Sequence, residues 1–132
     1  MPTIQTLTAS RNATWGPTLA YDYAGPALPL TGATIAMQLR LYPGQPYEAK
    51  LSLPNIAFTD ALVDGQPGTA TERRRLTLSP NVAPAALAAL PTAVEAGSDD
   101  TFAFDIRIAY ADGVFEILAS GQFILSPGVT TA

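Results

Sequence analysis

Cysteine and histidine are both absent from the 132 residues of this chain. Without cysteine there is no disulfide, no thiol nucleophile and no thiolate metal site. Without histidine, a Ser-His-Asp triad, a Cys-His pair and a histidine zinc site are excluded. We therefore predict no catalytic residues, no cofactor and no metal site, and we expect a protein that is not an enzyme.

Charge is also scarce, because charged residues make up 14% of the chain against roughly 25% in an ordinary soluble domain. This predicts that a partner covers part of the surface, although a compact β domain with small polar and Ala-rich faces would have the same composition. The net charge is −4, and Arg73-Arg74-Arg75 is the only basic cluster, so we expect no nucleic-acid binding. Because Arg74 would point away from its neighbours in a strand, the triplet favours a solvated edge strand.

Long apolar runs are missing as well. No segment approaches the ~20 apolar residues that cross a bilayer, and residues 1–5 lack the basic start and apolar run of a signal peptide. We expect a protein that is made in a cytoplasm and that does not enter a membrane.

Proline and glycine, by contrast, are frequent, with twelve and ten residues respectively. This punctuation favours short strands and turns over long helices. Residues 60–70, which contain Asp64-Gly65 and Pro67-Gly68, are predicted to form a loop. The predicted strands cover residues 4–9, 14–22, 33–42, 51–53, 56–58, 74–79, 101–111 and 114–126.

The last two of these strands carry the clearest pattern. Apolar side chains alternate along residues 101–111, which is typical of a half-buried strand. Asp112-Gly113 predicts a tight type I′ turn into an antiparallel hairpin. On the second strand the predicted core face consists of Phe115, Ile117, Ala119, Gly121, Phe123 and Leu125.

One short helix is expected near residues 83–90, where Pro84 suits a first turn and Pro91 ends the segment. No repeat or linker divides the sequence, so residues 1–132 are predicted to form one domain with a mobile tail at 127–132. The pattern predicts an all-β fold, an antiparallel immunoglobulin-like β-sandwich of about seven to eight strands. A small barrel is the alternative.

Three aromatic residues are the candidates for an interaction surface: Trp15, Tyr42 and Tyr47. Aromatic rings with a polar edge are favoured in contacts with proteins and sugars. Tyr42 and Tyr47 are the stronger candidates because they flank a Pro-Gly loop. Packing in the core would explain the aromatic residues equally well.

Two groups of segments resemble small structural proteins of phages and prophages. Near the N-terminus, residues 14–22 precede Leu-Pro-Leu-Thr-Gly-Ala and a strand that ends in Arg40. Near the C-terminus, Phe-Asp-Ile-Arg-Ile at 104–108, Asp112-Gly113 and the segment 121–130 resemble the closing hairpin of the same proteins. These are immunoglobulin-like modules of tail, baseplate and fibre-attachment proteins, similar to the N-terminal domain of siphophage upper baseplate proteins. Residues 43–71 lie outside the resemblance.

The resemblance implies a non-catalytic virion structural protein of a tail, a baseplate, a fibre or a capsid. Its expected partners are other virion proteins and further copies of the same chain. The alternative is a carbohydrate-binding module that recognises a glycan on the host surface. An exposed, planar aromatic cluster beside Asp, Asn or Gln would favour the glycan, whereas an apolar edge through which copies form a ring would favour the structural role.

Overall fold

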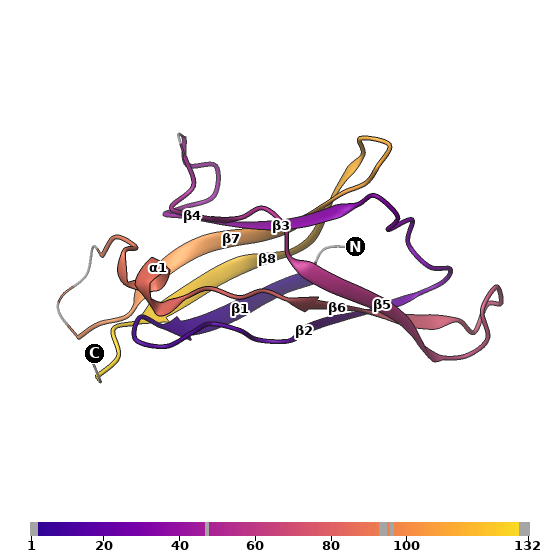
Figure 1. Cartoon of the computed structure of the whole chain (residues 1–132), viewed down its shortest axis with the longest axis horizontal. Helices are drawn as coiled ribbons and strands as arrows, with labels where there is room; N and C mark the ends of the chain where they lie inside the picture. The colour runs from indigo at the N-terminus through magenta and orange to yellow at the C-terminus, as the bar shows by residue number, and fades with distance from the viewer. Residues whose placement is uncertain (1–2, 47, 93–94, 96, 130–132) are drawn as a thin grey trace.

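The computed structural model describes residues 3–46, 48–92, 95 and 97–129, and they form an all-β sandwich of two sheets with one short helix (Figure 1). The sandwich predicted from the strand pattern is therefore confirmed. In chain order the elements are β1 (Thr3–Ser10), β2 (Leu19–Ala24), β3 (Thr34–Arg40), β4 (Leu51–Leu53), β5 (Ala57–Asp64), β6 (Arg73–Ser79), α1 (Pro84–Ala88), β7 (Asp100–Ala109) and β8 (Phe115–Ser126).

The strand order of the two sheets is that of an immunoglobulin-like sandwich. One sheet has the order β1-β8-β7-β3-β4 and the other the order β2-β6-β5. The strands β2, β6 and β5 thus correspond to strands B, E and D of an immunoglobulin domain, and β3, β7 and β8 correspond to strands C, F and G. The prediction of an antiparallel fold needs one correction, because β1 pairs with β8 in parallel. Parallel strands need a long connection, and β1 and β8 have one because all the other strands lie between them in the sequence.

The core lies between the sheets and is built from alternate residues of the strands. Leu76 and Leu78 of β6 face Ile35, Leu39 and other residues of the larger sheet, and all of these side chains are fully buried. The alternation follows from the two-residue period of a strand. The buried apolar residues on β7 are Phe102, Phe104, Ile106 and Ile108, which lie at the alternate positions predicted for the core face, and Asp100 at the start of the strand is buried as well.

Three predicted boundaries were wrong. The strand predicted at 14–22 begins only at Leu19, because Pro17 lacks an amide proton and cannot donate to a ladder. The strand predicted at 33–42 ends at Arg40. Its alternation predicts Leu41 on the core face with Ile35, Met37 and Leu39, but Leu41 is exposed. The loop predicted at 60–70 begins only after Asp64, because β5 continues to that residue along β6.

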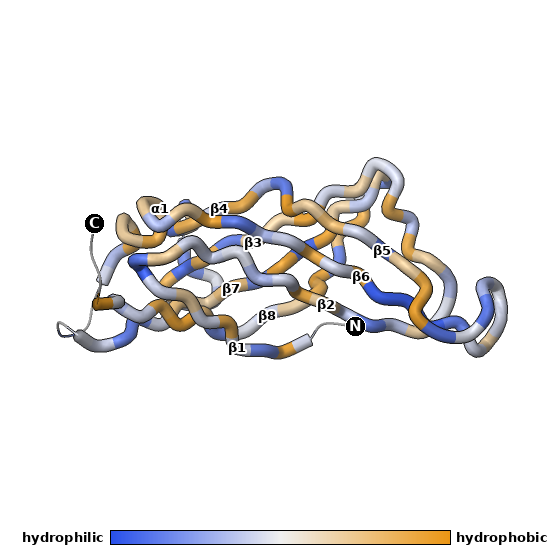
Figure 2. The backbone as a smooth tube through the Cα atoms, turned by 60° about the horizontal axis from the view of Figure 1, so that its bottom comes forward, coloured by the Kyte–Doolittle hydropathy of each residue, from blue (hydrophilic) through white to orange (hydrophobic). Residues whose placement is uncertain are grey.

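The edge position predicted for the arginine triplet was also wrong, because β6 is the middle strand of its sheet and its hydrophilic start is blue in Figure 2. Arg74 lies on the inner face with Leu76 and closes the end of the core. Its Nε is 3.1 Å from Asp60 Oδ2, and its Nη1 is 3.1 Å from Glu72 Oε2. The backbone N–H of Gly68 donates to Glu72, and this bond, with Arg74, holds the pKa of that carboxyl below its usual value.

The hairpin between β7 and β8 is confirmed, but its turn is wider than predicted. The N–H of Gly113 donates to the carbonyl of Tyr110, and the N–H of Tyr110 donates to Val114. With Gly113 at a φ of 89°, this is a three-residue loop that ends in a left-handed glycine. A two-residue type I′ turn at Asp112-Gly113 would be closed by Ala111 and Val114, whereas the residues that close this loop are Tyr110 and Val114.

A bulge on β8 overturns part of its predicted core face. Ile106 is opposite Ala119 and Arg107 is opposite Ile117, so Leu118 is an extra residue on β8. Because one extra residue reverses the face of every side chain before it, Phe115 and Ile117 lie on the outer face with Arg107. Of the predicted core residues, Ala119, Phe123 and Leu125 are buried as expected.

The helix α1 is shorter than the predicted 83–90 and is held by a distant arginine. Arg11, which follows β1, donates to the carbonyls of Leu87, Ala88 and Leu90 and forms an ion pair of 2.9 Å with Asp100 at the start of β7. It therefore satisfies carbonyls that the end of a helix leaves without partners. Of the predicted tail, residues 127–129 follow β8, and 130–132 lie outside the described residues.

Candidate interaction surface

The outer face of the β1-β8-β7-β3-β4 sheet carries mostly small and apolar side chains. Its residues alternate with the core residues on the same strands and are exposed or half-buried. We call this surface the outer face, and on its three central strands it consists of Thr34, Ala36, Gln38 and Arg40 of β3, Thr101, Ala103, Asp105, Arg107 and Ala109 of β7, and Phe115, Ile117, Ser120, Gln122, Ile124 and Ser126 of β8.

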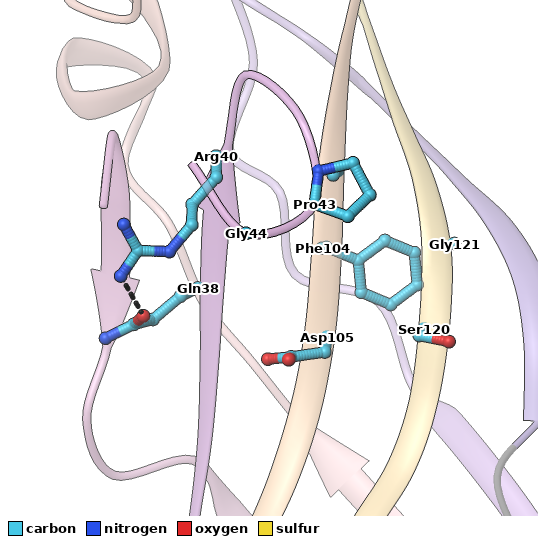
Figure 3. A pocket seen from close by; sticks show the side chains of 9 residues that line it. Gln38, Arg40, Pro43, Gly44, Phe104, Asp105, Ser120 and Gly121 are labelled. Atoms are coloured by element: carbon cyan, nitrogen blue, oxygen red, sulfur yellow. Dashed lines mark hydrogen bonds between the residues drawn. The ribbon is translucent and has the colours of Figure 1, made fainter. Parts of the chain in front are cut away.

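A hollow of about 480 Å³ lies on this face where the Pro43-Gly44 turn extends beside the strands (Figure 3). The small residues Ala103, Ser120 and Gly121 line it, and their size leaves the space open. A second hollow of about 150 Å³ adjoins the first through Gln38 and Asp105. The two form one trough along β7.

Arg40 fixes the turn that borders the larger hollow. One guanidinium nitrogen donates to the carbonyl of Gln45 at 3.1 Å, and another donates to Gln38 Oε1 at 3.1 Å, the bond drawn in Figure 3. The side chain of Gln45 in turn accepts the N–H of Leu41 at 2.7 Å. These bonds tie the turn to the end of β3, so the wall of the hollow is preorganised.

Two opposite charges lie in the middle of the trough, on adjacent outward positions of β7. Among the described residues, the carboxylate of Asp105 has no hydrogen bond or ion pair. The guanidinium of Arg107 lies over the ring of Phe115, 4.3 Å from its centroid, in a cation–π contact. Asp105 and Arg107 therefore both retain hydrogen-bonding capacity that a partner could use.

The structure separates the three residues predicted for the interaction surface. Trp15 is buried, its Nε1 donates to the carbonyl of Thr8 at 3.0 Å, and its ring meets Phe123 edge to face at 5.1 Å. It thus belongs to the core and has no ring face to offer a partner. Tyr42 is 54% exposed next to the turn, and its role as a contact residue stays a prediction. Tyr47 lies outside the described residues.

Three other tyrosines have their hydroxyls bonded within the protein. Tyr21 donates to Gln5 Oε1 at 2.6 Å and so connects β2 with β1, while Tyr23 contacts both oxygens of Asp60. Tyr110 donates to Glu116 at 2.8 Å. Burial raises the pKa of Tyr21 to about 12, and burial together with the Glu116 carboxylate raises that of Tyr110 to about 12. These hydroxyls are structural.

The outer-face residues missed by sequence reasoning were Ala103, Asp105, Arg107 and Phe115. Alternation along residues 101–111 already puts Ala103, Asp105 and Arg107 on the face opposite the core, but one small and two charged side chains form no motif that marks a site. Phe115 could not be found, because nothing in the apolar pattern of β8 marks Leu118 as the extra residue of a bulge.

The outer face offers apolar area, hydrogen-bonding groups and two opposite charges for noncovalent contact. Across the described residues, no three acidic side chains gather as a metal site would need, and no helix there is long and apolar enough to cross a membrane. No protein-family model matches this sequence, and no curated protein is significantly similar to it.

Proposed function

We propose that this protein is a phage virion structural protein, a non-catalytic module of a tail, a baseplate, a fibre or a capsid that acts through protein–protein contacts made by the outer face. The sequence resemblance supports this proposal from both ends of the chain. The feature that carries it is the trough on the outer face, an open sheet surface with small side chains and a fixed wall.

The composition of the outer face suits contact with a protein. Alanine and serine at 36, 103, 109 and 120 let a partner's backbone or side chains come close, and the apolar Ile117 and Ile124 supply area to bury. Each Å² of apolar surface removed from water contributes about 25 cal/mol. A stable interface needs about 800 Å² from each partner, which a sheet of five strands can provide.

The positions of the aromatic residues favour a protein partner over a glycan. Among the described residues, Tyr42 and Phe115 are the exposed aromatic side chains. Tyr42 follows Arg40, which pairs with Ala103, whereas Phe115 pairs with Ala109 at the other end of β7. Since a sugar-binding platform stacks rings on one saccharide, two rings at opposite ends of the face support the glycan poorly.

The experiment is peptide mass spectrometry on density-purified particles from the organism that encodes this chain. We expect the protein in the particles at a fixed ratio to the tail and capsid proteins.

The variant Ala103→Glu, which puts a charge in the hollow, should be lost from the particles, whereas Ala20→Glu on the exposed face of β2 should be retained. If complete particles lack the wild-type protein, the proposal is wrong; a glycan-array signal removed by Tyr42→Ala would instead support the sugar-binding module.

A further inference from the structure

We infer that one occupant of the outer face is a second copy of this chain, in a two-fold dimer that packs β7 across the partner's β7. This inference rests on the proposed function, since it takes the outer face as the docking surface and specifies what docks there. Three features of the face are self-complementary under one symmetry axis: its charges, its shape and the position of its remaining cation.

The charges provide the first argument. Asp105 and Arg107 point outward on either side of the inward-facing Ile106, about 7 Å apart along the strand. Suppose that two copies stack their outer faces, with a two-fold axis that lies between the sheets, perpendicular to β7 and level with Ile106. The partner's β7 then runs antiparallel to the first. Each Asp105 then lies opposite the partner's Arg107. A two-fold interface forms every contact twice, so both carboxylates, which have no partner within the described part of the chain, gain an ion pair.

The shape of the face provides the second argument. Phe115 is 57% exposed and level with Ala109, three residues beyond Ile106. The same axis carries it opposite the partner's Gln122, beside Ala103 and Gly121, which line the larger hollow. The ring contacts Arg107 of β7, so it lies on the side of β8 that faces this hollow. Each copy thus brings one exposed ring next to the hollow of the other.

The remaining cation on β3 is compatible with this arrangement. Arg40 pairs with Ala103 and Thr34 pairs with Ala109, so the axis brings each Arg40 opposite the partner's Thr34. No two like charges of β3 or β7 are then opposed. An axis parallel to β7 would instead put Asp105 against the partner's Asp105, which is unfavourable. The charges therefore select one of the two arrangements.

The test is sedimentation equilibrium of the whole chain over a concentration series up to about 100 μM, above the micromolar Kd of a weak interface of standard size. We expect the wild type to dimerise. Asp105→Arg and Arg107→Asp should each raise the dimer Kd at least about tenfold, because each puts like charges opposite one another. The double variant D105R/R107D should restore dimerisation, because the exchanged charges are again complementary.

A control pair, a further variant and a folding check separate charge pairing across the interface from changes in net charge or stability. The exposed pair Asp22 and Arg75 on the other sheet can be exchanged in the same way and should leave the dimer Kd unchanged. Phe115→Ala should weaken the dimer without changing the melting temperature by more than a few degrees, because the ring is exposed. Comparable melting temperatures for the Asp105 and Arg107 variants show that they fold.

The outcomes distinguish this inference from the proposed function. A wild type that stays monomeric throughout the series, or a dimer that the exchanged double variant does not restore, overturns the inference. If Ala103→Glu is nevertheless lost from particles, the outer face binds a different virion protein and the proposed function stands. If the dimer behaves as expected but the protein is absent from complete particles, the dimer stands and the proposed function fails.

Discussion

The carbonyl oxygen of Gln5 occupies the space that a side chain at position 121 would need. A Cβ on Gly121 would lie 1.9 Å from that oxygen, and the residue has a φ of 149°. Gln5 and Gly121 are partners in the parallel pairing of β1 with β8. The close approach of these two backbones therefore depends on the absence of a side chain.

Gly121→Ala should lower the free energy of unfolding by more than about 3 kcal/mol, because backbone strain adds to a clash that no rotamer change relieves. Gly113→Ala is the matched control, since Gly113 also has a positive φ but open space around it, and it should cost between about 1 and 2 kcal/mol. Urea unfolding followed by circular dichroism measures both. Equal losses for the two variants would contradict the role assigned to Gln5.

Arg11→Leu should destabilise the protein by about 3 kcal/mol. The substitution keeps an apolar side chain but removes the ion pair with Asp100, which is 6% exposed, and the donors to the carbonyls after α1. Arg75→Leu breaks an exposed pair with Asp22, and it should destabilise the protein far less because water screens these charges. Chemical denaturation in low and high salt distinguishes them, and a small effect of Arg11→Leu would mean that the buried contacts are not what holds α1.

Trp15→Phe should destabilise the fold by between about 1 and 3 kcal/mol, because it leaves the Thr8 carbonyl without its donor and creates a small cavity beside Phe123. Thermal unfolding measures the loss. Trp15 is the only tryptophan, so the native wild-type fluorescence should be that of a buried indole. Red-shifted emission typical of a solvated indole would show that the ring is not in the core.

High pH should destabilise the protein through Tyr21 and Tyr110. Their pKa values are raised from 10 to about 12, so the folded state holds their protons more tightly than the unfolded state does. The resulting stability is fully present below pH 10 and is lost as the pH rises through about 12. Tyr21→Phe should flatten this decline in the free energy of unfolding between these pH values. An unchanged slope in the variant would contradict the assignment to Tyr21.

The candidate site was only partly predictable. Tyr42 was chosen because it flanks a Pro-Gly loop, and it is indeed exposed beside the hollow. Trp15 was chosen for its ring, yet the same size and amphipathic character suit a core residue that bonds the Thr8 carbonyl. Composition does not distinguish these two uses, because burial depends on what the rest of the chain packs against the ring.

The class of fold and the side-chain alternation on β3 and β7 follow from the amino-acid sequence alone, because a strand's two-residue period is a local property of the backbone. Three features are visible only in the folded chain: β1 pairs with β8 in parallel, β6 is a central strand, and a bulge at Leu118 turns Phe115 outward. These features depend on the registers between distant segments. Many registers satisfy the same local pattern, and close packing of the whole core selects among them.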